Sequence, residues 1–289
     1  MTSRVEVAGV AAVQAVGGSR WLVHLEAPAV APQVRPGHFL LVRCTDPRYP
    51  AYDPFLPRAY FVFAVDRQAG RMSLLVEERG RGSAWLASRR QGDPVLVHGP
   101  IGREITPARL TRNLLLLAEG PTGVAGLALL GTEAGSAGRS VTLIENAADG
   151  AGLPPALLAA EVEYRTTTPD GGGLLGALPA LLGWADEVVI AAPGPLLDTL
   201  SALRRARLEP FSLYGNLPVQ AIPLPDSTPH AGDAAPPGGG DAVPCGDGRC
   251  GACTVQTGRG PRLFCREGPA FPLETLRFEP DMLEAVAGT

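Results

Sequence analysis

The sequence predicts a multidomain α+β protein, in which an antiparallel β-barrel is followed by a doubly wound α/β domain and a small C-terminal cysteine module. Short strand-like stretches separated by turn residues fill the first third of the chain, and strands alternating with helical stretches fill the middle. Four of the five cysteines fall within twenty-one residues near the C-terminus. The 289 residues are enough for two ordinary domains and a small third one.

Residues 1–105 are expected to form the barrel. Turn residues there separate stretches in which apolar and polar side chains alternate, as they do in half-buried antiparallel strands. A helix is expected at 83–90, with Ser83 as its N-cap. The six predicted strands are 5–16, 20–25, 38–43, 58–65, 71–77 and 94–98.

Residues 106–222 are expected to form the α/β domain, because apolar strands alternate there with helical stretches, a pattern typical of a parallel sheet covered by helices. Residues 223–241 are rich in Pro, Gly and Asp and are expected to be a linker, and residues 242–289 form the cysteine module. The predicted strands of the α/β domain are 114–118, 140–144 and 187–191, with helices at about 120–132 and 174–182.

The cysteine module contains Cys245, Cys250, Cys253 and Cys265 in the spacing C-x4-C-x2-C-x11-C. The first three match the opening triplet of plant-type [2Fe-2S] ligation. Glycines between them let the backbone curl tightly, so that thiolates and N–H groups can face one small inorganic core. The residues between Cys253 and Cys265 predict a hairpin that returns Cys265 to the side of Cys253. The sequence therefore predicts a [2Fe-2S] cluster held by these four thiolates.

Structural zinc and disulfide bonds are the other uses that such cysteines can have. Zinc ribbons usually present two C-x2-C pairs, whereas this chain has one such pair and two single cysteines. Disulfides need an oxidising compartment, and the first eighteen residues lack the continuous apolar core of an export signal. Both alternatives are less favoured than the cluster. The fifth cysteine, Cys44, is expected to be a small buried apolar residue.

Charge and composition narrow the possible partners and the compartment. The net charge of -4 and the pI near 5.6 leave no basic field for nucleic acid or for an anionic membrane surface. No apolar run reaches membrane-spanning length. We therefore expect a cytoplasmic protein that binds neither nucleic acid nor membrane. Because no nucleophile elbow, Walker loop or paired-carboxylate motif is found, no catalytic residue is assigned in this chain.

A predicted iron-sulfur cluster makes a flavin site the next expectation. Such a cluster moves single electrons whereas nicotinamide delivers a hydride, and a flavin converts between the two. Two stretches of the barrel qualify as a flavin site. Arg58, Ala59 and Tyr60 offer a cation for phosphate and a ring to pack on the flavin. The turn containing Gly80, Gly82 and Ser83 opens a predicted helix whose backbone N–H groups suit a pyrophosphate.

The whole pattern resembles the electron-transfer subunit of the two-component, NAD-dependent dihydroorotate dehydrogenases, a branch of the ferredoxin reductase superfamily. The cysteine module is the most specific part of the resemblance. This module ends in Cys265-Arg-Glu-Gly-Pro269. The other motifs extend the resemblance over almost the whole chain, and they are Pro36-Gly-His-Phe39, Arg58-Ala-Tyr60, Gly80-Arg-Gly-Ser83, Gly99-Pro-Ile-Gly102 and Asp170-Gly171.

The resemblance implies FAD in the barrel, NADH in the α/β domain and a [2Fe-2S] cluster in the C-terminal module. It also implies a heterotetramer with two FMN-containing dihydroorotate dehydrogenase catalytic subunits, so that catalysis on orotate resides in the partner. In the α/β domain, Gly120 and Gly123 match the glycine-rich loop that follows the first strand of the family.

The sequence departs from the family around the place of hydride transfer. Phe61 replaces a Ser or Thr that can hydrogen-bond the flavin, and Ala192 replaces a cysteine near the nicotinamide end. In the glycine-rich loop, Pro121 removes an N–H donor, and Glu119 adds negative charge beside it. These departures predict a weakened or absent NADH site. Glu145, after the second strand of the α/β domain, is either a ribose-binding acid or a solvated strand-end acid.

Three functions follow from these observations. In the first, the chain passes electrons between NADH, FAD and the cluster to or from a dihydroorotate dehydrogenase catalytic subunit. In the second, the chain is an NADH-independent electron relay that serves another redox partner. In the third, it is a binding or assembly subunit that keeps the fold without the flavin. The cysteine module favours the first two functions.

Overall fold

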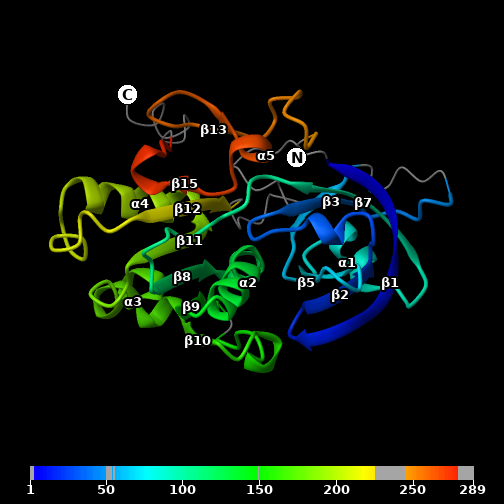
Figure 1. The fold of residues 1–289 in the computed structure, drawn as a ribbon, viewed down its shortest axis with the longest axis horizontal. Helices are drawn as coiled ribbons and strands as arrows, with labels where there is room; N and C mark the ends of the chain where they lie inside the picture. Colours follow the sequence, from blue (N-terminus) through cyan, green and yellow to red (C-terminus); the bar gives the residue numbers. More distant parts are fainter. Residues whose placement is uncertain (1–2, 50–53, 55, 149, 225–244, 279–289) are drawn as a thin grey trace.

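The computed structural model describes residues 3–49, 54, 56–148, 150–224 and 245–278 (Figure 1). The N-terminal barrel, the α/β sheet and the cysteine module lie against one another, and helix α2 (Gly120–Ser136) lies between the α/β sheet and the barrel (Figure 1). The fold class predicted from the sequence is confirmed.

The first sheet has seven strands in the order β4-β3-β7-β1-β2-β6-β5, and all of its pairings are antiparallel. The long strand β1 pairs with β2 on one side and with β7 on the other. The short helix α1 (Arg81–Ala87) packs against this sheet. The strands are β1 (Arg4–Gly17), β2 (Arg20–Glu26), β3 (Phe39–Arg43), β4 (Arg58–Phe61), β5 (Ala64–Asp66), β6 (Arg71–Glu77) and β7 (Pro94–Ile101).

The sheet curls because its two edge strands, β4 and β5, are consecutive in the chain and are joined by only two residues. The predicted strand 58–65 is interrupted after Phe61, and this interruption gives seven strands where the sequence predicts six. Within the interruption, the N–H of Val62 donates to the carbonyl of His38 at 3.2 Å. The N–H of Phe63 donates at 2.9 Å to the carbonyl of Ser73 on β6, which is next to the opposite edge strand, β5. These two bonds connect the edges as the predicted barrel requires.

The second sheet has the order β10-β9-β8-β11-β12-β15, and its first five strands are parallel. The sequence predicts three of these strands and two of the three helices, whereas β10, β12 and α4 are not predicted. The parallel strands are β8 (Asn113–Glu119), β9 (Ser140–Asn146), β10 (Val162–Thr167), β11 (Glu187–Pro193) and β12 (Val219–Leu224), with helices α2, α3 (Gly173–Leu181) and α4 (Gly194–Arg205).

Strand β8 lies at the topological switch point of this sheet, because the chain proceeds to β9 on one side and later to β11 on the other. In open α/β sheets, ligands bind outside the carboxyl ends of the strands at such a point. Helices α2, α3 and α4 all begin at this edge, after β8, β10 and β11 respectively. The fold therefore places three helix N-termini around one possible ligand site.

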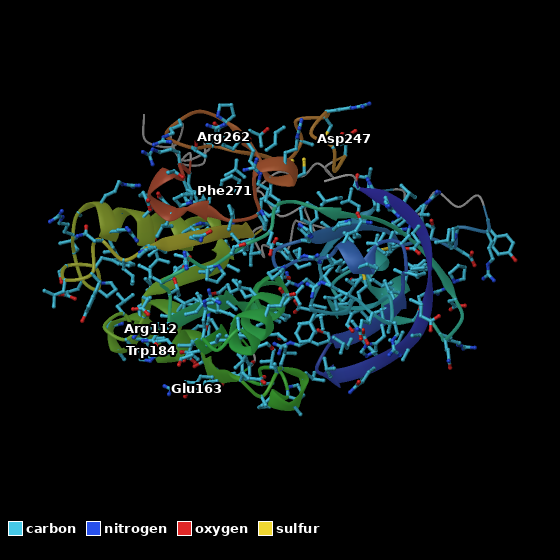
Figure 2. All side chains as sticks on the ribbon, in the orientation of Figure 1. Arg112, Glu163, Trp184, Asp247, Arg262 and Phe271 are labelled. Atoms are coloured by element: carbon cyan, nitrogen blue, oxygen red, sulfur yellow. The ribbon has the colours of Figure 1, made fainter. Side chains whose placement is uncertain are left out.

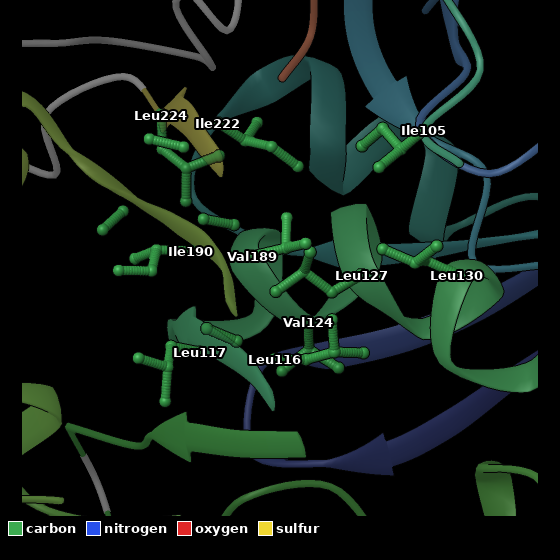
Figure 3. Close-up of a cluster of buried hydrophobic side chains, with 14 of the residues drawn as sticks. Ile105, Leu116, Leu117, Val124, Leu127, Leu130, Val189, Ile190, Ile222 and Leu224 are labelled. Atoms are coloured by element: carbon green, nitrogen blue, oxygen red, sulfur yellow. The ribbon is translucent and has the colours of Figure 1, made fainter. Parts of the chain in front are cut away.

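A continuous apolar core fills the space between the α/β sheet and the helix that covers it. Helix α2 is buried over most of its length, and its side chains meet those of the central strands (Figure 3). The same core extends into the barrel and the cysteine module, so the three parts share buried surface. Side chains labelled in this core are Ile105, Leu116, Leu117, Val124, Leu127, Leu130, Val189, Ile190, Ile222 and Leu224 (Figure 3).

The cysteine module is small and contains the predicted hairpin. Strands β13 (Thr254–Val255) and β14 (Arg262–Leu263) pair antiparallel, and helix α5 (Phe264–Glu267) follows directly. Strand β15 (Phe271–Pro272) then pairs antiparallel with β12 at the edge of the α/β sheet. In Figure 2, Asp247 lies in the outer loop of the module, and Phe271 lies on the side of the α/β sheet.

Hydrogen bonds fix the module to the barrel as well as to the α/β sheet. The N–H of Gly102, just after β7, donates to the carbonyl of Cys265 at 3.2 Å, and the N–H of Arg103 donates to the carbonyl of Gly268 at 2.6 Å. Of the predicted linker 223–241, the first two residues belong to β12, and the rest lies outside the described residues. The module is therefore held at both neighbouring parts by backbone contacts.

Within the described residues, no helix is long and apolar enough to cross a membrane.

Candidate electron-transfer site

The four cysteines of the module lie in two pairs that are close in space. The backbone N–H groups of Arg249 and Cys250 donate to Cys245 Sγ at 3.2 and 3.4 Å, and the N–H of Cys245 donates to Cys250 Sγ at 3.2 Å. In the second pair, the N–H of Cys265 donates to Cys253 Sγ at 3.3 Å. The predicted return of Cys265 to the side of Cys253 is thus confirmed. N–H donors aimed at sulfur favour thiolates, which is the ligating form.

The loop around the first pair depends on glycines with positive φ. Gly248 has φ of 80°, and a Cβ there would lie 2.2 Å from Cδ of Arg266, so the stem of Arg266 lies flat against the loop. Gly246 also has φ of 80°, and a Cβ there would lie 2.7 Å from Cδ1 of Ile101 on β7. Glycine is needed at both positions because a side chain would be strained and would also clash.

Hydrogen bonds to the thiols, within and beside the two pairs, shift their pKa values. The N–H of Ala252 lowers the pKa of Cys250, and the Cys265 thiol, which donates to Cys253, lowers the pKa of Cys253 to about 6. The same shared proton raises the pKa of Cys265. One thiolate in each pair is therefore favoured before any metal binds.

The arrangement fits a cluster with two iron atoms. Two neighbouring thiol pairs match a [2Fe-2S] unit, in which each iron takes two cysteine ligands. None of the five cysteines, all of which the structure describes, forms a disulfide. Cys253 and Cys265 are buried, whereas Cys250 is exposed, so the inner pair faces the protein and the outer pair faces solvent.

The structure brings together the two barrel stretches that the sequence predicts as a flavin site. Arg58 on β4 is buried and lies against the first turn of α1, where a Cβ at Gly82 would be 3.1 Å from Arg58 Nε. The absence of a side chain at Gly82 thus lets the guanidinium approach the helix start. Ala59 and Tyr60 follow on the same strand and are half-buried. A cation beside a helix start is suited to an anionic group such as a pyrophosphate.

Ser83 has a different place from the one that the sequence predicts. The N-cap of α1 is Gly80, and Ser83 is the third helical residue, so the predicted N-cap is wrong. The Ser83 hydroxyl accepts from the N–H groups of Arg79 and Gly80 at 2.9 and 3.0 Å. The side chain thus hydrogen-bonds the backbone that precedes the helix and stabilises the turn at Arg79 and Gly80, as the N3 side chain of a capping box does. The helix therefore begins two residues earlier than predicted, at Arg81.

A cluster of phenylalanines connects the flavin strand with the cysteine module. Phe61, directly after Tyr60, is buried, and its ring centroid lies 6.1 Å from that of Phe39 and 6.5 Å from that of Phe264. Phe264 precedes Cys265, and its ring is 5.6 Å from that of Phe39. Sequence reasoning treats Phe61 only as a lost hydrogen-bonding group. The apolar character of all three residues is the signal that could have indicated a packing role.

The glycine-rich loop of the α/β domain lies at the switch point. Gly120 has φ of 59°, and a Cβ at Gly123 would lie 3.0 Å from the carbonyl oxygen of Ala191 on β11. Gly123 therefore permits the close approach of α2 to the sheet. Pro121 lies in the first turn of α2, and Ala192 is buried within β11.

Glu119 and Asn146 end the neighbouring strands β8 and β9 and interact at this edge. Asn146 Nδ2 donates to Glu119 Oε1 at 2.7 Å. Both residues line a cavity of about 460 Å³ that also contacts the starts of α3 and α4. This cavity has the position expected for the nucleotide.

Glu145 does not reach the cavity, so both sequence interpretations of it are wrong. It is fully buried, and its Oε1 lies 3.6 Å from Arg20 of the barrel. The hydroxyl of Tyr164 donates to its other oxygen and accepts from the N–H of Leu153 at 2.8 Å. Burial and the bond to Glu145 raise the pKa of Tyr164. Glu145 therefore joins two parts of the molecule instead of meeting a ribose or solvent.

Comparison with known proteins supports this interpretation of the cysteine module. Residues 242–277 match the family model described as the iron-sulfur cluster binding domain of dihydroorotate dehydrogenase B. A relative in Desulforamulus reducens, named dihydroorotate dehydrogenase B (NAD(+)), electron transfer subunit, is 29% identical over 210 residues. That match covers 70% of this chain and 78% of the relative. The chain resembles the electron-transfer subunits of dihydroorotate dehydrogenase B.

A second subunit of the same name, from Geobacillus thermodenitrificans, is 28% identical over 63% of this chain and 72% of its own length. Among solved structures, an NADH-dependent reduced ferredoxin-NADP oxidoreductase superposes with a TM-score of 0.71 at 18% identity, covering 98% of this chain and 94% of that chain. At this identity the superposition shows the shared fold, which extends over all three parts of the molecule.

Proposed function

We propose that the chain is the electron-transfer subunit of an NAD-dependent dihydroorotate dehydrogenase. In this role it passes electrons between NADH, FAD and a [2Fe-2S] cluster and exchanges them with a catalytic subunit that acts on dihydroorotate. The similarity to two subunits of this name and the match of the cysteine module support the proposal. The chain itself carries no catalytic residue for dihydroorotate in this scheme.

The observation that carries the proposal is the position of the two thiol pairs. The inner pair, Cys253 and Cys265, is buried beside Phe264, which contacts Phe61 on the flavin strand. The outer pair, Cys245 and Cys250, lies on the side of the module that is accessible from solvent. A cluster held by both pairs would have one side toward the barrel and one toward a partner. This is the arrangement that an electron relay between two proteins requires.

The cofactors would be held by the residues that the fold brings together. The four cysteines would bind the cluster, and Arg58, Ala59, Tyr60, Gly80 and Gly82 would bind FAD. Ser83 would shape the FAD site by holding its turn, and Gly120 and Gly123 would admit NADH at the switch point. The bound flavin supplies the conversion between hydride and single-electron chemistry that the amino acids of this chain cannot perform.

The partner would be an FMN-containing catalytic subunit, and two copies of each chain would form a heterotetramer. The face presented to the partner would be the exposed loop that holds the outer thiol pair. A cavity of about 770 Å³ beside this loop is lined by Arg103, Arg249 and Arg266 and by the acids Glu104 and Asp247. The arginines outnumber the acids, and this excess of positive charge would favour an acidic surface on the partner.

An anaerobic visible spectrum tests the proposed function. The purified protein should show flavin and iron-sulfur absorbance, and NADH should bleach the flavin within the mixing time of a manual experiment. Reduction by dithionite but not by NADH would instead identify an NADH-independent relay. Absence of both cofactors after anaerobic purification would contradict either electron-transfer role. Co-purification with an FMN-containing dihydroorotate dehydrogenase subunit tests the partner.

A further inference from the structure

The cavity at the carboxyl edge of the parallel sheet has an unusual charge for a site that should accept a nucleotide. Glu119 is the ionisable side chain that lines it, and no Lys or Arg is among its lining residues within the described part of the chain. The pyrophosphate of a pyridine nucleotide carries negative charge. Attraction for it must therefore come from backbone N–H groups at helix starts.

Each of the three helix starts has fewer N–H groups available than an ordinary helix start. Pro121 in the first turn of α2 and Pro195 in the first turn of α4 each lack an N–H group. Gly172 and Gly173 at the start of α3 line the cavity, but their N–H groups already donate to the carbonyls of Pro169 and Thr168 at 3.1 and 3.0 Å. Backbone attraction for an anion is therefore limited at this edge, and the charge of Glu119 has a correspondingly larger effect.

The carboxylate of Glu119 is held in place rather than free to swing away. Asn146 Nδ2 donates to it at 2.7 Å, and the Asn146 side chain is buried at the end of β9. Asn146 is 8% exposed, and its Oδ1 has no hydrogen-bond partner among the described residues. A buried acceptor without a partner in a cavity points to a ligand that donates a hydrogen bond, such as a ribose hydroxyl.

Among the described residues that line the cavity, no charge offsets that of Glu119. The residues that face it are Asn146 from β9, the glycines at the start of α3, and Pro193 and Pro195 around the start of α4. None of them is ionisable. Burial raises the pKa of Glu119, and the bond from Asn146 opposes this only in part.

We infer that Glu119 sets the affinity and the pH dependence of nucleotide binding, with its carboxylate opposing the pyrophosphate while Asn146 accepts a hydrogen bond from the nucleotide sugar. This inference rests on the proposed function, because it concerns the NADH site of that function. The neutral form of Glu119 predominates below its raised pKa, so binding of the anionic nucleotide strengthens as the pH falls toward that value and weakens as the carboxylate forms.

The experiment measures ADP-ribose binding by calorimetry to the full-length, cofactor-loaded protein between about pH 8 and about pH 5.5. ADP-ribose contains the pyrophosphate and sugars but cannot transfer a hydride. The test variant is Glu119→Gln, in which the side-chain carbonyl can still accept from Asn146. The matched control is Glu163→Gln on β10, an exposed carboxylate in the same sheet that does not line the cavity (Figure 2).

Glu119→Gln should bind ADP-ribose about threefold to tenfold more tightly than the unchanged protein at the alkaline end, and the difference should shrink as the pH falls. The control should follow the unchanged protein at every pH. Equal affinity of all three proteins, with NADH still bleaching the flavin, would overturn the inference and leave the proposed function standing. Failure of every protein to bind ADP-ribose and to react with NADH would overturn both. Flavin absorbance and the melting temperature confirm that each variant is folded.

Discussion

At the scale of single residues, the two thiol pairs differ in their surroundings. Cys245 and Cys250 receive most of the backbone N–H donors, whereas Cys253 and Cys265 are buried against the aromatic cluster. Loss of any one thiolate removes a quarter of the ligands and leaves one iron with incomplete protein ligation. We therefore expect that replacing any one of the four cysteines abolishes cluster binding.

Cys250→Ser is expected to lose the cluster while retaining the flavin, because the proposed FAD residues lie on β4 and around the start of α1, outside the cysteine module. Iron content and the visible spectrum after anaerobic purification measure both groups. Cys44→Ala is the matched control, since Cys44 is fully buried in the barrel and distant in sequence from the module. Iron content in Cys250→Ser equal to that of the control would contradict the proposed ligand set.

The sequence predicts that Cys265 lies beside Cys253, because the two are joined by a short hairpin, and short hairpins leave a regular sequence pattern. The fate of Glu145 could not be predicted in the same way. Its partner Arg20 lies more than a hundred positions earlier, and only the folded arrangement brings the two side chains to 3.6 Å. The predicted N-cap role of Ser83 is wrong because a serine near a helix start can act either as the N-cap or as the N3 residue, and the sequence does not distinguish the two.

At the scale of elements, helix α5 and strand β15 fasten the cysteine module. Phe264 in α5 is fully buried and contacts Phe39 and Phe61 of the barrel, while Phe271 in β15 pairs with the α/β sheet. The centroids of these two rings are 6.5 Å apart, so Phe264 and Phe271 form one apolar unit. The position of the module thus depends on side-chain packing as well as on backbone bonds.

Phe264→Ala should lower the free energy of unfolding by about 3–5 kcal/mol, because it removes a buried ring and leaves a cavity between three parts of the molecule. Urea unfolding followed by tryptophan fluorescence measures the loss, and iron content reports whether the module still holds its cluster. Leu213→Ala is the control, as Leu213 is 83% exposed. A change no larger than that of the control would show that the ring does not hold the module.

The predicted elements are those with strong apolar patterns, such as β8 and β11. The sequence does not predict strand β10, because its residues VEYRTT are mostly polar. Polar residues are tolerated there because β10 is the edge strand of the parallel sheet. Strand β12 was missed because Pro223 lies near its end, and a proline argues against a central strand. The sequence does not predict helix α4, which begins at Gly194 and Pro195, because glycine and proline are more typical of turns.

At the scale of the whole molecule, a buried polar network joins the barrel to the α/β sheet. Arg20 on β2 is 5% exposed and is paired with Glu145 on β9, which also accepts from Tyr164 on β10. Removing one member of a buried ion pair leaves the other charge buried without a partner, which is destabilising. Replacing both members with apolar residues leaves no buried charge. The network therefore makes the stability of each part depend on the other.

Arg20→Met is expected to lower the free energy of unfolding by about 3–5 kcal/mol, since it leaves the Glu145 carboxylate buried without its cation. The double variant Arg20→Met with Glu145→Leu should recover much of that loss. Thermal and urea unfolding of the single and double variants form a double-mutant cycle that measures the coupling. Additive losses would mean that the two residues act independently.

The pairing of β15 with β12 has a consequence for solubility. Backbone groups along the edge of a sheet can recruit the strand of another molecule, and proteins generally cover such edges. Here the cysteine module covers the apolar strand β12 with Phe271 and Pro272. A protein whose module has detached would present that edge to its neighbours, so loss of the module would promote self-association as well as the loss of electron transfer.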